Sequence, residues 1–80
     1  MVRFADTHVF REQRFSIGSD RETGGYFLST PISGHMAAVE FEGYFSISAA
    51  EYRQFSVTPD SALRFLHDCR MGRHSDRRLE

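Results

Sequence analysis

The sequence predicts an α+β domain: a small, meander-like antiparallel β-sheet of four to five strands, followed by two short C-terminal helices packed on one of its faces. Three observations lead to this fold class. Short apolar stretches separated by turn-forming residues fill positions 2–47. Helix-start signals and helical spacing follow in the second half of the chain. The length of 80 residues allows one small hydrophobic core, so positions 1–72 are expected to form a single domain.

The strands are read from alternating apolar positions between turn signals. The alternation changes phase at 11–13, where a turn or a bulge is expected and the two are not distinguished. Turn-forming residues predict loops at 18–25 and 32–36. Pro31 is expected to end the strand before it, because proline cannot donate to a ladder, and Gly43 marks a hairpin or a bulge. The candidate strands are 2–10, 12–17, 26–30, 37–42 and 44–47.

Two helices are predicted from their start signals. Ser48 with Glu51 three positions later has the pattern of a capping box and opens a helix through Phe55. The Thr-Pro-Asp sequence at 58–60 supplies an N-cap, a proline at the first helical position and an acidic first turn for a second helix. Gly72 is a natural stop. The expected apolar stripe of the second helix is Ala62, Leu63, Leu66 and Cys69, with Phe65 at its margin.

Positions 73–80 are polar and are expected to form a disordered tail. The closing pair Leu79 and Glu80 is typical of a cloning remnant, so it receives no functional meaning.

Composition excludes several function classes. The chain has ten basic and eleven acidic residues, and every basic residue is arginine. The net charge of −1 gives no overall attraction for nucleic acid or an anionic membrane. The absence of lysine excludes Schiff-base chemistry and a P-loop lysine. A single cysteine cannot form an intrachain disulfide, and no apolar stretch reaches the roughly 18 residues of a membrane span. A soluble, cytoplasmic protein is expected.

Two aromatic doublets, Tyr26-Phe27 and Tyr44-Phe45, suggest a binding face. Adjacent strand residues point to opposite sides, so each doublet places one ring on each face of the sheet. Two short helices cover one face only, and tyrosine and arginine are enriched at the centres of protein interfaces. Plain sheet packing is the alternative, and Leu28 could itself face inward. The residues assigned to the helix-covered face are Phe15, Ile17, Phe27, Val39, Phe41, Phe45 and Ile47, and those assigned to the exposed face are Arg14, Tyr26, Leu28, Glu40, Glu42 and Tyr44.

The leading functional hypothesis is a non-catalytic protein–protein interaction module, of an antitoxin, immunity, inhibitor or accessory type. Its predicted docking residues are Arg14, Tyr26, Leu28 and Tyr44. The partner is another protein or a second copy of the chain, because the same face could close a homodimer.

A nucleic-acid-binding domain is the alternative hypothesis. The C-terminal quarter is rich in arginine, but interleaved acidic residues and the neutral total charge argue against it. The residues assigned to this alternative are Arg64, Arg70, Arg73 and Arg77. An uncharacterised small enzyme or ligand-binding domain is the third hypothesis.

No catalytic, metal or cofactor site is predicted. Glu40 and Glu42 could act as a carboxylate pair, but a solvated strand face explains them more simply. His67 and Cys69 are close to His74 in sequence, yet His67 and Cys69 point about 160° apart on one helix and cannot share an ion. A buried structural cysteine is the simpler interpretation.

Overall fold

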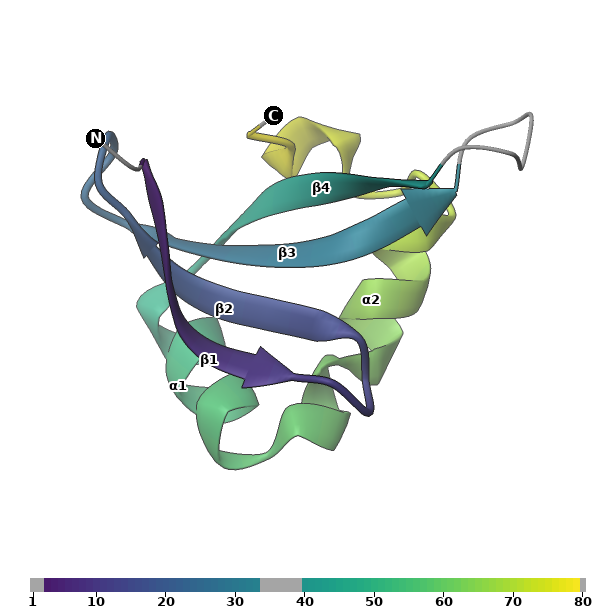
Figure 1. Cartoon of the computed structure of the whole chain (residues 1–80), viewed down its shortest axis with the longest axis horizontal. Coiled ribbons are helices and arrows are strands. Elements are labelled where there is room, and N and C mark those ends of the chain that lie inside the picture. Colours follow the sequence, from purple (N-terminus) through teal and green to yellow (C-terminus); the bar gives the residue numbers. More distant parts are fainter. Residues whose placement is uncertain (1–2, 34–39, 80) are drawn as a thin grey trace.

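The computed structural model describes residues 3–33 and 40–79, and it confirms the predicted α+β fold class. Among these residues a four-stranded antiparallel sheet has the order β1-β2-β3-β4, so each strand pairs with its neighbour in sequence. The helices follow the sheet along the chain, and Figure 1 shows α1 and α2 together on one side of it. The strands are β1 (Phe4–Phe10), β2 (Phe15–Asp20), β3 (Tyr26–Ser33) and β4 (Glu40–Ile47).

The predicted capping box opens the first helix, α1 (Ala49–Val57). The side-chain hydroxyl of Ser48 accepts from the Glu51 N–H at 3.1 Å, and the Glu51 carboxylate accepts from the Ser48 N–H at 2.8 Å. Two orphan donors at the helix start are therefore satisfied within the chain.

The second predicted helix is a 3₁₀ turn, η1 (Pro59–Ala62), that runs directly into α2 (Leu63–Arg70). Pro59 occupies the first position, as its fixed φ angle favours. The last described turn is η2 (Ser75–Arg77). None of the described helices has the length and apolar character needed to cross a membrane.

The hydrophobic core lies between the sheet and the helices. Leu66, Ala62 and Cys69 of the predicted stripe are buried, whereas Leu63 is 48% exposed, so its assignment to the stripe is wrong. The η1–α2 segment begins as a 3₁₀ helix, which changes the angle between successive side chains and rotates Leu63 away from the sheet. The main cluster consists of Phe15, Ile17, Leu28, Ile47, Phe55, Ala62 and Leu66, and a second one of Ile32, Phe45 and Cys69.

Pro31 and Gly43 do not interrupt their strands, contrary to the sequence interpretation. Pro31 lies inside β3, opposite Glu42, beyond the last β2–β3 pair of Ser16 with Ser29. β2 does not extend as far as Pro31, so a backbone N–H directed to the β2 side of β3 would find no acceptor there. The missing N–H of proline is therefore tolerated. Gly43 lies within β4 and pairs with Thr30, and a Cβ at this position would collide with the Ile32 side chain, which explains the glycine there.

The phase change near 11–13 is a turn, and the bulge lies elsewhere. Residues 11–14 form the turn between β1 and β2, where Arg14 adopts a positive φ of 60°. The register of β1 shifts between Asp6 and His8, so Thr7 is the extra residue. The bulge bends β1 over β2, and Gly18 permits the approach because a Cβ there would overlap the Ala5 carbonyl.

The structure places positions 73–79, for which the sequence predicts a disordered tail, against β4. The Leu79 N–H donates to the Tyr44 carbonyl at 2.7 Å, and Arg78 forms an isolated antiparallel bridge with Phe45. The Arg77 guanidinium pairs with Glu51 at 3.0 Å. Most of the expected 32–36 loop and the start of the expected 37–42 strand lie outside the described residues.

Candidate functional site

The candidate site is the sheet face that the helices leave uncovered, called the open face below. Residues directly opposite each other in an antiparallel ladder point to the same side. Tracing the register from Phe4 across to Ser46 therefore defines this face. Its described residues are Phe4, Asp6, Val9, Ser16, Gly18, Asp20, Phe27, Ser29, Pro31, Glu42, Tyr44 and Ser46.

Three aromatic rings contact one another across one end of the open face. The Phe4 ring lies 4.3 Å from the Tyr44 ring, stacked, and 5.0 Å from the Phe27 ring. Phe27 is fully buried beneath the other two. Because β1 and β4 are the outer strands of the sheet, the contact between Phe4 and Tyr44 shows that the sheet curls toward this face.

Arg3 ties the start of β1 to the turn after β2. Its Nε atom lies 3.1 Å from the Asp20 carboxylate and 3.2 Å from the Glu22 carboxylate, and its guanidinium carbon lies 4.7 Å from the Phe4 ring centre. The Arg3 hydrogen bond outweighs the burial of Asp20, and with the Glu22 N–H it lowers the pKa of this carboxyl. The guanidinium and the ionised Asp20 therefore neutralise one another at the margin of the open face.

Small residues occupy the middle of the open face. The hydroxyls of Ser16 and Ser29 lie 2.6 Å apart and both residues are buried. Val9 stands beside Ser16 on β1 and is 61% exposed. Ser16 and Ser29 thus form a low centre of the open face, with the larger side chains of Val9 and Tyr44 on either side of it.

Two exposed carboxylates on the open face form no ion pair with the described residues. Asp6 on β1 and Glu42 on β4 are exposed. Neither side chain forms a hydrogen bond or ion pair with the residues described by the structure. The exposed part of the face is therefore acidic as well as apolar.

The structure places two of the four predicted docking residues on the covered side. Leu28 is fully buried in the main core, and Tyr26 stacks on Tyr52 of α1 at 4.3 Å between ring centres. Phe27, assigned to the covered face, points to the open face instead. Tyr26-Phe27-Leu28 is apolar throughout, so parity alone does not fix its phase, and the pairing with β2 decides it.

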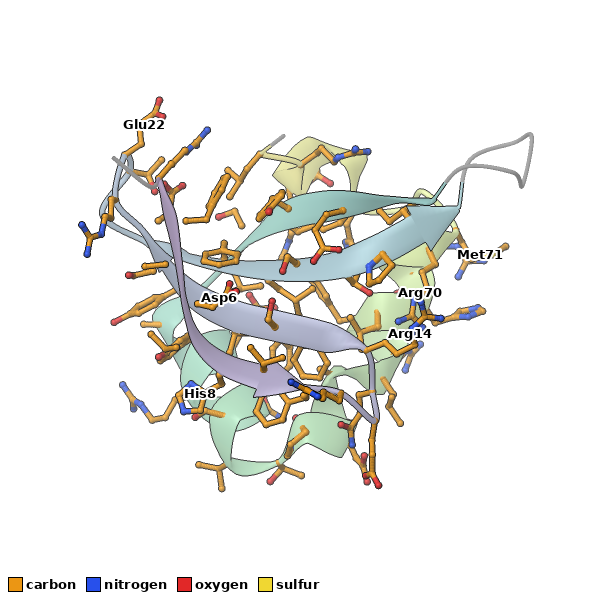
Figure 2. The ribbon with its side chains drawn as sticks, viewed as in Figure 1. Asp6, His8, Arg14, Glu22, Arg70 and Met71 are labelled. Carbon is orange, nitrogen blue, oxygen red and sulfur yellow. The ribbon has the colours of Figure 1, made fainter. Side chains whose placement is uncertain are left out.

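The other two predicted docking residues, Arg14 and Tyr44, lie on different parts of the surface. Tyr44 belongs to the open face, whereas Arg14 lies in the β1–β2 turn beside the C-terminal end of α2. Figure 2 shows Arg14 and Arg70 together at this end, and both bind Thr30: its hydroxyl donates to the Arg14 carbonyl at 2.9 Å and accepts from Arg70 at 3.1 Å. The four predicted residues consequently do not share one surface.

Three of the four arginines assigned to nucleic-acid binding are engaged within the chain. Arg70 donates to Thr30, Arg73 lies 3.1 Å from Asp68, and Arg77 pairs with Glu51. Arg64 is exposed. The structure therefore brings no continuous set of unpaired guanidinium groups together from these four residues.

The thiol and imidazoles of the C-terminal region do not converge. Cys69 is 2% exposed, and burial together with the nearby Asp68 charge raises its pKa to about 12, which keeps the thiol protonated. His74 stacks on Phe65 at 4.5 Å, and His67 is exposed. Residues 3–33 and 40–79 contain no group of three potential metal ligands. The Glu40 side chain, considered above with Glu42 as a carboxylate pair and interpreted as part of a solvated strand face, lies outside the described residues.

The sequence interpretation missed Phe4, Asp6 and Val9 as members of the open face. All three lie on β1, where the bulge at Thr7 changes the alternation between Asp6 and His8. The loose pattern of positions 2–10 was the available signal, because a bulge breaks strict period two. Comparison with protein-family models, with curated proteins and with solved structures found no match.

Proposed function

We propose that this chain is a small protein-binding module that docks through its open face. The carrying observation is that the described helices cover one face of the sheet, while the other presents the 61% exposed Val9 and, on its far side, the stacked Phe4 and Tyr44 rings. Apolar and aromatic side chains around a closely packed centre are typical of the middle of a protein interface.

Contacts within the chain order the side chains of the open face. The rings of Phe4, Phe27 and Tyr44 touch one another across the sheet, and Arg3 pairs with Asp20 at its margin. A surface that is already ordered loses less conformational entropy on binding. This supports docking as a rigid surface.

The buried thiol and hydroxyls behind the open face are unsuited to nucleophilic catalysis, which supports docking. The thiol of Cys69 is buried and protonated, and the Ser16 and Ser29 hydroxyls bond to one another. A nucleophile needs an adjacent base or a lowered pKa, and neither group has one here.

A matched pair of substitutions tests the proposal. Val9→Arg places a long charged side chain on the open face beside its low centre, whereas Val57→Arg adds the same group at the end of α1, where Val57 is 78% exposed. Immobilised wild-type and variant proteins are incubated with nuclease-treated lysate of the source organism, and bound proteins are quantified by mass spectrometry. We expect one stoichiometric partner that Val57→Arg retains and Val9→Arg reduces by more than about fivefold, the loss of an interface residue worth over 1 kcal/mol.

Circular dichroism melts accompany the capture, because both substituted positions are exposed and neither variant should unfold. Equal capture by both variants would place the partner elsewhere on the surface. Capture that disappears with nuclease would favour the nucleic-acid alternative. If only the chain itself were recovered and it sedimented as a dimer, the open face would be interpreted as a homodimer interface.

A further inference from the structure

We infer that the partner presents arginine or lysine side chains to the open face. This inference rests on the proposed function and adds the chemistry of the partner. It starts from Asp6 and Glu42, which are exposed on that face and form no ion pair with the residues described by the structure. Charges at an interface are arranged so that opposite signs meet, and a partner that left these carboxylates facing carboxylates would be repelled.

Arg3 shows how the open face holds a guanidinium group. Its side chain lies between the Asp20 and Glu22 carboxylates and over the Phe4 ring, at 4.7 Å from the ring centre. Carboxylates thus supply charge while an aromatic face supports the planar cation.

The same combination is offered to a partner on β4. Glu42 and Tyr44 are two residues apart and point to the same side of this strand. A guanidinium from a partner that pairs with the Glu42 carboxylate would therefore lie beside an aromatic ring, as the Arg3 guanidinium does at the other end of the face.

The two carboxylates lie on the two outer strands of the sheet, Asp6 on β1 and Glu42 on β4. The sheet curls toward the open face, so that the Phe4 and Tyr44 rings of these strands touch. A partner that covers this face therefore meets a carboxylate from each margin, and its cations are expected at those margins.

The helical side carries exposed charges of both signs, Arg53 and Arg64 together with Asp60 and Asp76. The attraction of a cationic partner to the open face therefore depends on Asp6 and Glu42 themselves.

A peptide of alternating arginine and glycine is the probe. An extended alternating peptide places all its arginines on one side, spaced by about 7 Å. It is titrated into the ¹⁵N-labelled chain, and amide chemical shifts are followed by NMR. We expect salt-sensitive shifts at Asp6, Val9, Glu42 and Tyr44, which disappear when the salt concentration rises from about 50 to about 500 mM.

Neutralising substitutions separate the open face from general attraction between opposite charges. Asp6→Asn and Glu42→Gln should each weaken peptide binding about two- to fivefold, the range for exposed ion pairs. Asp60→Asn with Asp76→Asn removes two exposed carboxylates of the helical side and should leave binding unchanged. A peptide of alternating glutamate and glycine should produce no shifts on the open face.

The outcomes distinguish this inference from the proposed function. Equal weakening by the two sets of variants, shifts confined to the helices, or no peptide binding at all would overturn the cationic partner. A protein partner whose capture is lost with Val9→Arg but withstands both neutralising substitutions and high salt would also overturn it, while the proposed function would stand. If neither Val9→Arg nor the neutralising substitutions reduced capture, both the proposed function and the cationic partner would be overturned.

Discussion

Asp20 is the residue whose ionisation is most closely tied to the fold. Its carboxylate is 1% exposed, accepts from Arg3 at 3.1 Å and from the Glu22 N–H at 3.0 Å, and its pKa lies below the ordinary value of 3.8. A lowered pKa in the folded state means that the ionised form stabilises the fold above the unfolded pKa. This stabilisation is lost as the pH falls through the folded pKa.

Asp20→Asn should therefore reduce the free energy of unfolding at pH 7 by about 1–2 kcal/mol, because a hydrogen bond to a charged group is lost while Arg3 remains partly solvated. The difference from wild type should narrow as the pH is lowered below 3.8. Urea unfolding at several pH values measures both effects. Glu22→Gln is the control, since Glu22 contacts the same guanidinium but is 69% exposed. A Glu22→Gln effect as large as that of Asp20→Asn would show that burial does not matter here.

At the same scale, the sequence predicted correctly that aromatic and acidic side chains would form the open face, but it assigned several individual residues to the wrong side. Glu42 and Tyr44 lie where their alternation placed them, because the parity of β4 is regular from Glu42 to Ile47. Tyr26, Phe27 and Leu28 were assigned to the wrong sides. Three successive apolar residues carry no phase, and the phase comes from the contact of Leu28 with Ile17 across the ladder.

The bend of β1 is the feature of a single element that most affects the candidate site. It brings Phe4 over Phe27 and depends on the bulge at Thr7 and on the absence of a side chain at Gly18. Without this bend the first strand would continue flat along β2, and the ring contact between Phe4 and Tyr44 would not form.

Gly18→Ala should destabilise the fold by about 2 kcal/mol or more, because the new methyl group overlaps backbone atoms of Ala5 that cannot rotate away. Hydrogen exchange of the β1 amides should accelerate more than that of β3. Gly25→Ala is the matched control, since its Cβ would lie at an ordinary 3.5 Å from the Thr23 hydroxyl. It should change stability by less than about 0.5 kcal/mol. Equal effects of the two substitutions in denaturant unfolding would contradict the role given to Gly18.

Helices were more predictable than strand ends, for a physical reason. The Ser48 and Glu51 capping box and the Thr58-Pro59 start involve residues within one turn of each other, so the signal is contained in the local sequence. The sequence interpretation treated Pro31 and Gly43 as strand breakers, because these residue types usually end strands. Whether a strand tolerates them depends on neighbours that are distant in sequence. Only the ladder shows that Pro31 lies past β2 and that Gly43 faces Ile32.

On the scale of the whole molecule, the two sides differ in how their exposed charges are mixed. The exposed carboxylates Asp6 and Glu42 lie on the open face, while the helical side exposes arginines and carboxylates together: Arg53, Arg64, Asp60 and Asp76. The net charge of −1 does not show this difference. Composition could exclude a strongly basic nucleic-acid binder, but the distribution of charge between faces required the register of all four strands.

Tyr44, in the middle of the chain, is the residue at which both ends of the described chain meet. Its ring stacks on Phe4 and its carbonyl accepts from Leu79, so residues 75 positions apart in sequence contact one side chain and its backbone. The fold is therefore nearly a closed ring of chain, and circular permutation should be tolerated. A permutant that keeps Arg3, with positions 3 and 79 joined by a short glycine linker and with new ends between Gly24 and Gly25, should unfold cooperatively, with the wild-type circular dichroism spectrum. A permutant that fails to fold would contradict this expectation. It would show that β1 can pack over the sheet only when its N-terminal end is free, even though the two ends of the chain lie close together.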